Sequence, residues 1–281
     1  MDIIVVTLAS VAEAITDWPR WKLMWLLAFA IFAACKLITW RAAKVPNARA
    51  RRPLAYLLAW PGLDANRFLD PQCRPNEPAI REWISAVFQL VLGAAIFWNA
   101  QYSFFAASPI LLGWAGMVGV VLILHFGIFK LMSCAWRMVG VDARPLMVAP
   151  LAATSITEFW GKRWNTAFRD FAHEMLFHPL ARRCGVSKAL FLTFVFSGLI
   201  HDVVISLPAG AGYGGPAAFF VIQLVAMAIE RSRLGRELGL GRGRHGWLFT
   251  ATVLIVPAAL LFHAYFIHAV VIPFMRALGA A

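Results

Sequence analysis

The apolar positions of the chain are gathered into long runs, separated by segments that carry most of the charge. A helix that crosses a lipid bilayer needs about 20 mostly apolar residues. The pattern predicts about seven such spans, of which the first is the weakest: 3–16, 21–40, 83–101, 109–132, 188–207, 216–232 and 247–275. The last run is long enough to tilt strongly, or to break near Pro257 or Pro273.

The overall composition supports a membrane-embedded chain. Of the 281 residues, 61% are hydrophobic and 14% are charged, and the mean hydropathy is +0.71. Soluble globular proteins are close to half apolar and a quarter charged, so a water-soluble fold of this length could not bury so much apolar surface. We therefore expect an all-α, polytopic transmembrane bundle that forms a single membrane-embedded domain over residues 1–281.

Charge lies mainly in the segments between the spans. The net charge is +12, and basic residues gather in 41–82, 134–188 and 231–244, whereas 102–108 and 208–215 carry no charge. Basic loops stay on the cytoplasmic side, so the alternation places the N-terminus inside and the C-terminus outside. The net positive charge is then better explained by contact with anionic lipid headgroups and by membrane orientation than by binding to nucleic acid. We expect a multi-pass protein of a bacterial cytoplasmic membrane.

Two cytoplasmic segments are too aromatic to be simple connectors. Residues 54–70 hold an apolar stretch too short to cross the bilayer, which predicts an interfacial or re-entrant element stopped by Pro61-Gly62. Residues 154–180 predict an amphipathic interfacial helix that begins at a capping box of Ser155 and Glu158 and ends at Pro179. Its aromatic face is formed by Trp160, Trp164, Phe168 and Phe171, and its polar face by Lys162, Arg169 and His173.

Among the ionisable residues within the spans, His201 is the strongest candidate for a catalytic role. It lies about a dozen residues into the span that begins near Lys188, well inside the hydrocarbon at about 1.5 Å per residue. A buried imidazole distant from charge tends to stay neutral, which is the form that a general base requires. One turn earlier, Ser197 and Gly198 share its helix face and would leave room for a substrate. Asp202 points about 100° away, so we expect it to contact a neighbouring helix.

Position alone leaves structural alternatives open. A single intramembrane histidine such as His201 is as often a hydrogen-bonding partner between helices as a catalytic group. Asn165, at the border of the aromatic face, is equally explained as an interfacial polar residue. Lys36, Lys130 and Glu230 lie near span ends, where snorkelling of the side chain towards the interface explains them.

No residue pattern indicates a metal or cofactor site. The four cysteines show no ligand spacing: Cys35, Cys73, Cys134 and Cys184. Two pairs of histidines are five residues apart, so their side chains point about 140° apart on a helix: His173 with His178, and His263 with His268. The P-loop, GxSxG and HEXXH motifs are absent from the sequence. We therefore expect no metal and no resident cofactor.

Two motifs resemble a known family. The runs are Phe159-Trp160-Gly161-Lys162-Arg163-Trp164-Asn165 and Ser197-Gly198-Leu199-Ile200-His201-Asp202. They resemble the wax synthase branch of the membrane-bound O-acyltransferase (MBOAT) superfamily, whose two signature polar residues Asn165 and His201 match. Residues 54–70 also resemble an element of bacterial members, and the motif core covers about 154–207. Asp202 stands where plant members usually have Glu, and the chain is shorter than most superfamily members.

The resemblance implies an O-acyltransferase that moves an acyl group from acyl-CoA to the hydroxyl of a hydrophobic alcohol. On this interpretation, His201 takes the hydroxyl proton, and Asn165 positions the donor or stabilises the oxyanion. The basic cytoplasmic face suits the phosphates of coenzyme A, and no metal is required. Further residues that the resemblance implies in donor or substrate binding are Trp160, Arg163, Trp164, Ser197 and Asp202.

Two other hypotheses fit the sequence. The first is an O-acyltransferase that acts on a glycan, a sterol or a secondary metabolite, because the motifs do not distinguish between acceptors. The second is a non-enzymatic transporter in which His201 packs helices or relays protons. Transporters of this kind often show two related halves with broken helices, and the sequence shows no such symmetry. The acyltransferase hypothesis therefore rests on the pair of motifs.

Overall fold

The fold is a bundle of helices. The computed structural model describes residues 18–45 and 52–281, and all regular structure within them is helical. Five helical segments there are long and apolar enough to cross a membrane: Arg20–Ala42, Ile80–Tyr102, Pro109–Met138, Val186–Ala209 and Gly243–Leu261. These segments confirm the predicted all-α membrane bundle. The predicted span 3–16 and the predicted cytoplasmic N-terminus lie outside the described residues.

The long segments are built as follows along the chain. The first three are α2 (Arg20–Ala42), α5 (Ile80–Asn99) and α6 (Pro109–Val121), which continues through a π-helical turn, η3 (Leu122–Ile128), into α7 (Phe129–Met138). The fourth joins α11 (Val186–His201), the π turn η7 (Asp202–Ser206) and α12 (Leu207–Ala209). The fifth joins α15 (Gly243–Ile255) and α16 (Ala258–Leu261).

Shorter helices complete the bundle. Predicted span 216–232 is α13 (Gly215–Arg231), which at 17 residues is shorter than the five long segments. The others are α3 (Arg52–Ala59), α4 (Ala65–Leu69), α8 (Ile156–Glu158), α9 (Thr166–Ala172), α10 (His178–Cys184), α14 (Arg233–Glu237), α17 (Ala264–Phe266) and α18 (Ile272–Ala277). Three further π turns are η5 (Phe159–Arg163), η6 (His173–Phe177) and η8 (Ile267–Val271), and short 3-10 turns span Ala100–Tyr102, Phe104–Ala107 and Pro150–Ala152.

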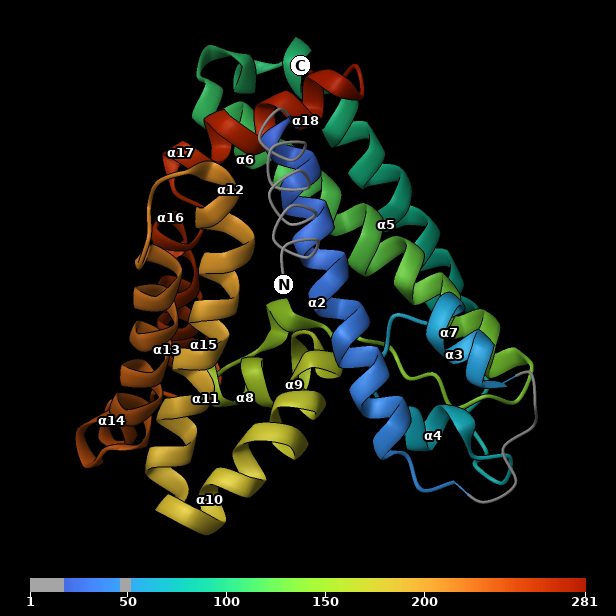
Figure 1. Ribbon diagram of the computed structural model, residues 1–281. Coiled ribbons are helices and arrows are strands. Elements are labelled where there is room, and N and C mark those ends of the chain that lie inside the picture. Colours follow the sequence, from blue (N-terminus) through green and yellow to red (C-terminus); the bar gives the residue numbers. More distant parts are fainter. Residues whose placement is uncertain (1–17, 46–51) are drawn as a thin grey trace, which may run out of the picture.

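The two ends of the bundle differ in charge as the loop pattern predicts. Helices α4, α10 and α14, which belong to the basic segments, lie at the lower end in Figure 1. Helix α12, which leads into the uncharged loop, lies at the upper end with α18 and the C-terminus. Arg20 holds the start of α2 at this upper end, because its guanidinium donates to the carbonyls of Pro208 (3.1 Å) and Ala209 (2.8 Å). The basic segments therefore share one face of the bundle.

Glycines let α5 approach the α6–η3 segment closely. A Cβ atom added at Gly93 would lie 2.8 Å from the carbonyl oxygen of Gly119, and one added at Gly127 would lie 2.9 Å from Leu90 Cβ. Small residues of this kind are typical of helix contacts in membranes, where close packing replaces the hydrophobic driving force. Because Gly127 faces α5, side chains on the other side of η3 are directed into the bundle.

Three prolines occur inside continuous helix, each two residues after a π turn. Pro179 follows η6, Pro208 follows η7 and Pro273 follows η8. In each case the residue before the proline donates its N–H to the carbonyl five residues back. A proline in a regular helix clashes with the carbonyl four residues back, and the wider π turn moves that carbonyl away. The prediction that Pro179 ends a helix is therefore wrong.

The predicted last span, 247–275, consists of two helical segments. Helix α15 ends at Ile255, just before Pro257, so the predicted break near that proline is confirmed. The chain turns again at His263, which has extended dihedrals and caps α17 by accepting the N–H of Phe266 at Nδ1 (3.2 Å). Pro273 makes no break, for the reason given above.

The predicted interfacial element is α3 with the loop that follows it, and α3 ends at Ala59, ahead of Pro61-Gly62. Lys36 of α2 holds this loop, since its Nζ donates to the carbonyl of Gly62 (2.6 Å) and lies 3.4 Å from the ring centroid of Tyr56. Lys36 is only 2% exposed. Its predicted snorkelling towards the interface is therefore wrong: the lysine is a buried link between α2 and the loop.

Candidate functional site

The described residues form one large, partly open cavity, with a volume of about 1330 Å³. Its walls come from α2, the loop after α3, the α6–η3–α7 segment, residues 157–177, and helices α11, α13, α15 and α16. Most of the lining side chains are aliphatic or aromatic. Pockets for one drug-sized ligand measure about 300–1,000 Å³, so the cavity has room for two reactants at once.

The cavity brings together five of the seven residues singled out in the sequence. His201, Asn165, Trp160, Trp164 and Ser197 line it. The two predicted binding residues that lie away from its wall are Arg163 and Asp202. Their contacts, described below, explain what they do instead.

The predicted single helix over 154–180 is wrong, because the chain breaks at Trp164 and Asn165. Trp164 has extended dihedrals, and Asn165 has a left-handed backbone with φ 41° and ψ 61°. Asparagine adopts this region more readily than most residues and is also a good N-cap. Helix α9 therefore begins anew after the break, and the break itself turns Asn165 into the cavity wall.

Asn165 uses only part of its carboxamide within the protein. Its Oδ1 accepts the backbone N–H of Phe168 (3.2 Å), which caps α9, and its own N–H donates to Met147 Sδ (3.3 Å). The side-chain NH₂ group has no hydrogen-bond partner among the described residues. The cap fixes the orientation of the amide, so Asn165 offers the cavity a donor.

A short extended segment supports Asn165 from behind. Thr166 N–H donates to the carbonyl of Leu146 (3.0 Å), and Val148 N–H donates to the carbonyl of Arg163 (2.8 Å), so the two segments pair on both sides of the break. Sequence periodicity gave no sign of this pairing, because the extended segment is only a few residues long.

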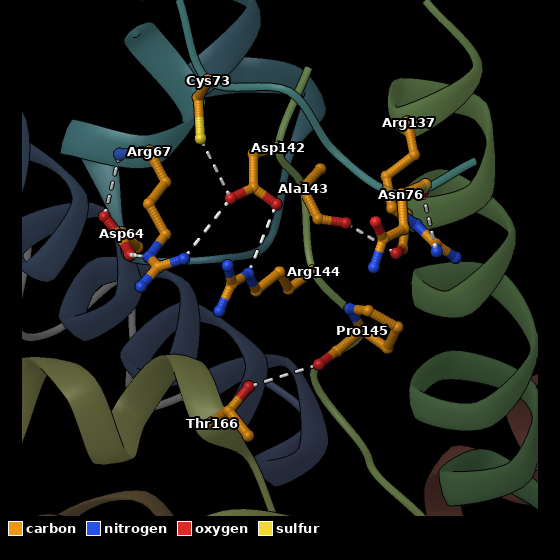
Figure 2. Close-up of polar contacts among 11 residues, drawn as sticks. Asp64, Arg67, Cys73, Asn76, Arg137, Asp142, Ala143, Arg144, Pro145 and Thr166 are labelled. Atoms are coloured by element: carbon orange, nitrogen blue, oxygen red, sulfur yellow. Dashed lines mark hydrogen bonds and ion pairs between the residues drawn. The ribbon is translucent and has the colours of Figure 1, made fainter. Parts of the chain in front are cut away.

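A buried carboxylate, Asp142, anchors the extended segment that contains Leu146 and Val148, as Figure 2 shows. The Asp142 side chain is 5% exposed and accepts from Arg67 (3.4 Å), Arg144 (3.4 Å) and the thiol of Cys73 (3.3 Å). Burial and this hydrogen bond to a carboxylate raise the pKa of Cys73. In the same view, Thr166 Oγ1 donates to the carbonyl of Pro145 (3.4 Å). The anchor therefore reaches from the loops at the basic end of the bundle to the residue next to Asn165.

The start of α8 is capped largely as the sequence predicts. Ser155 Oγ accepts the N–H of Glu158 (2.9 Å). The Glu158 carboxylate accepts the N–H of Thr154 (2.9 Å) and pairs with Arg163 (2.7 Å), and both contacts hold the pKa of Glu158 below its usual value, the Thr154 bond most strongly. Arg163 also donates to the carbonyls of Val148 and Ala149. It therefore ties the motif segment 159–165 to the extended segment and does not line the cavity.

Glu230 connects the motif segment to α13. Its carboxylate accepts the backbone N–H groups of Ile156 (2.8 Å) and Thr157 (3.0 Å), together with the Thr157 hydroxyl. An acidic group at a helix N-terminus satisfies free N–H groups and complements the helix dipole. Glu230 is 5% exposed, so its predicted snorkelling is wrong.

His201 stands at the junction of α11 and η7, with one nitrogen occupied. Its Nδ1 lies 2.7 Å from the carbonyl oxygen of Ser197, and its ring centroid lies 4.8 Å from that of Phe220. A carbonyl oxygen only accepts, so Nδ1 of the neutral ring carries the proton and Nε2 keeps its lone pair. Nε2 has no hydrogen-bond partner among the described residues. The geometry thus leaves a proton acceptor for a ligand in the cavity.

The other residues of the second motif hold helices together. Ser197 lines the cavity, but its hydroxyl donates to the Thr193 carbonyl (3.0 Å). A Cβ atom at Gly198 would lie 2.6 Å from Ala217 Cα, so this glycine allows α13 to pack closely against α11. It does not provide the predicted room for a substrate. Asp202 accepts from the N–H groups of Gly214 (2.9 Å) and Ala217 (3.3 Å). The predicted contact of Asp202 with a neighbouring helix is therefore present, at the N-terminus of α13.

Charged side chains line part of the cavity. Arg169 and His173, predicted on a polar face turned away from the aromatic residues, both line it, as do Asp170 and Arg231. The break at Asn165 changes which side of α9 faces inward, which is why the prediction failed. Burial raises the pKa of Asp170 although Arg169 pairs with it (2.6 Å). The sequence analysis missed Asp170 and Arg231 as cavity residues.

In residues 18–45 and 52–281, no three His, Cys, Asp or Glu side chains come close enough together to hold a metal ion.

Comparison with known proteins gives matches to the core of the chain. Residues 143–222 match the Membrane bound O-acyl transferase family. The chain is 30% identical over 138 residues to "Probable long-chain-alcohol O-fatty-acyltransferase 7" of Arabidopsis thaliana (44% of this chain, 40% of the relative). It is 31% identical over 134 residues to "Long-chain-alcohol O-fatty-acyltransferase" of Simmondsia chinensis (39% and 38%). It is also 30% identical over 74 residues to "Acyl-CoA--sterol O-acyltransferase 1" of Arabidopsis thaliana (24% and 21%).

The matches cover the motif core and leave much of each relative unmatched. The aligned segments span about two fifths of the length of the two long-chain-alcohol relatives. All three relatives are plant proteins, so the expectation of a bacterial membrane has no support from them. The apolar helices and the family match agree on a multi-pass membrane protein. The resemblance read from the two motifs is confirmed: residues 143–222 carry a Membrane bound O-acyl transferase family domain.

Proposed function

We propose that this chain transfers an acyl group from acyl-CoA to the hydroxyl of a long-chain alcohol, forming an ester and free coenzyme A. The observation that carries the proposal is the chemistry on the wall of one large apolar cavity: His201 presents a free imidazole nitrogen there, and Asn165 presents a free NH₂ group. The relatives named for acyl transfer to long-chain alcohols support the same reaction.

The two groups have complementary roles in the proposed reaction. Nε2 of His201 takes the proton of the alcohol as its oxygen attacks the thioester carbonyl. The NH₂ group of Asn165 donates to the carbonyl oxygen while negative charge develops on it. When the intermediate collapses, the carbon–sulfur bond breaks, and the leaving thiolate takes the proton from His201. The ester and the free thiol are then complete, and His201 returns to its neutral form.

The cavity lining suggests where each reactant lies. Arg169 and Arg231 belong to the segments at the basic end of the bundle, so we place the coenzyme A phosphates on that side. The aliphatic and aromatic walls provide for the acyl chain and the alkyl chain of the alcohol. On this proposal the donor enters from the cytoplasm and the alcohol from the lipid.

A sterol is the second candidate acceptor. It is favoured by the 30% identity to a relative named for acyl transfer from acyl-CoA to a sterol. That match covers only 24% of this chain, whereas the long-chain-alcohol matches cover about two fifths, so we rank the linear alcohol first.

The test is acyl transfer by membranes that contain the wild-type chain or its His201→Ala variant. Labelled palmitoyl-CoA is offered with long-chain alcohols or sterols, and the labelled ester is measured at equal membrane abundance. Loss of general-base catalysis predicts a fall of about 10²- to 10⁴-fold in the variant. The control is His245→Ala, because His245 is exposed and does not line the cavity. A His201→Ala protein that keeps its full rate would exclude His201 as the base.

A further inference from the structure

The cavity wall holds a second imidazole, which the proposed reaction does not use. His125 lies in the π turn η3 and lines the same cavity as His201. Its Nδ1 atom is buried and has no hydrogen-bond partner among the described residues. A buried nitrogen without a partner destabilises a protein, because it has lost its hydrogen bond to water. The other ring nitrogen, Nε2, also has no hydrogen-bond partner among the described residues and is not closed off in this way, so it is the atom that can bond a ligand in the cavity.

The surroundings of His125 fix its ring towards the cavity. Gly127, two residues later, lies against Leu90 of α5, so the side of η3 that carries His125 is turned the other way. The imidazole stacks on Trp164, with ring centroids 6.4 Å apart and planes inclined by 17°, and Phe129 meets it edge-on at 5.3 Å. π turns occur frequently at functional sites. The ring is therefore held in place by apolar neighbours, and Nε2 is left to bond a ligand.

A row of aromatic rings separates His125 from His201. Trp164 stacks on Phe159 at 5.5 Å, and Phe159 meets Trp160 at 5.1 Å. Trp160 in turn contacts Phe220 at 5.4 Å, and Phe220 contacts His201 at 4.8 Å. The two imidazoles are thus at opposite ends of this row. An oxygen bound by His125 is therefore a different atom from the hydroxyl oxygen that His201 deprotonates.

We propose that His125 is a specificity-determining residue, which hydrogen-bonds a second oxygen on the aliphatic chain of a substrate, away from the reacting group. The cavity would then prefer a hydroxylated lipid to a plain one. This inference rests on the proposed acyl transfer. The second oxygen belongs to the acceptor, as in a long-chain diol, or to the acyl group, as in a hydroxyacyl-CoA, and the two sources share the same hydrogen-bonding chemistry.

The test compares substrate pairs that differ by one hydroxyl, in the wild-type chain and in His125→Phe. Phenylalanine keeps the ring that stacks on Trp164 and removes both nitrogens. One arm compares alkanols with diols of equal length, using palmitoyl-CoA as the donor. The other arm compares palmitoyl-CoA with hydroxypalmitoyl-CoA, using one alkanol as the acceptor. A single ordinary hydrogen bond predicts a wild-type preference in kcat/KM of about 2- to 12-fold for the hydroxylated member of one pair.

The expected result is that this preference falls to about one in His125→Phe and is kept in His245→Phe, whose side chain is exposed. Equal kcat/KM values for both members of both pairs in wild type would overturn the inference, as would a preference that survives in His125→Phe. A thermal-shift measurement with the same diols, alkanols, palmitoyl-CoA and hydroxypalmitoyl-CoA separates the two proposals. If no ester forms with any substrate but the diol or the hydroxyacyl-CoA stabilises wild type more than its plain partner does, and His125→Phe loses this difference, the proposed function fails while the binding role of His125 stands. If neither hydroxylated compound stabilises wild type more than its plain partner does, the inference fails.

Discussion

Replacing Asn165 by aspartate separates its two contributions to the site. The present side chain caps α9 through Oδ1 and leaves its NH₂ group to the cavity. An aspartate keeps an oxygen for the N–H of Phe168 and tolerates the left-handed backbone, so the cap and the break survive. It has no NH₂ group, and its negative charge opposes the charge that develops on the thioester oxygen. The substitution therefore removes the donor while it keeps the local fold.

The expected magnitudes differ enough to decide between the two roles. Loss of one oxyanion donor typically lowers kcat by about 10²- to 10³-fold. Loss of an N-cap costs about 0.5–2 kcal/mol of stability, which Asn165→Asp avoids and Asn165→Ala does not. We expect Asn165→Asp to melt close to wild type and to lose at least about 100-fold in kcat, and Asn165→Ala to lose both activity and stability.

The assay combines ester formation at saturating palmitoyl-CoA and alcohol with thermal unfolding of the same detergent-purified protein. Asn165→Gly serves as a further control, since glycine suits the positive φ but supplies neither cap nor donor. Full turnover by Asn165→Asp would refute the donor role and leave Asn165 as a helix cap alone. A melting temperature that falls as far in Asn165→Asp as in Asn165→Ala would refute the structural half of the reasoning.

Two further predictions concern stability. Gly198→Val should lower the melting temperature, because overpacking costs about 1–3 kcal/mol and the new Cβ atom would lie 2.6 Å from Ala217 Cα. The control is Gly161→Ala, where a Cβ atom meets nothing within 4 Å. Equal melting temperatures of the two variants would contradict the close helix contact at Gly198. The lowered pKa of Glu158 means that its contacts stabilise the fold above the usual carboxyl pKa and that this stability is lost as the pH falls through the lowered value. Glu158→Gln should therefore melt below wild type at pH 7 and approach it in the acid range, and a constant difference across that range would argue against the charged pair.

The sequence predicts the parts of the fold that follow from composition and periodicity. Apolar runs locate the five long helical segments, and basic loops identify the face that they share. The two motifs locate His201 and Asn165, which the structure places on one cavity wall. These features depend on local residue types, so they can be read without knowing which segments meet in space.

The features that escaped prediction depend on contacts between distant segments or on unusual backbone. An aromatic stripe at helical spacing suggested a continuous helix, but the left-handed Asn165 interrupts it. Pro179 suggested a helix end, but the preceding π turn lets the helix continue. Lys36 and Glu230 lie near span ends and suggested snorkelling, yet each is buried against backbone groups far away in the chain. Neither partner can be identified from spacing alone.

Helix α13 is fixed to both halves of the site by carboxylates at its two ends. Asp202, next to His201, holds its N-terminus, and its own Glu230 holds the segment that leads to Asn165. Adding or removing one residue within its 17 would shift one end relative to the other by about 1.5 Å and rotate it by about 100°. Either carboxylate would then lose its partners, and His201 and Asn165 would no longer keep their relative positions. The length of α13 is therefore fixed by these contacts at its two ends, independently of the side chains on its exposed side.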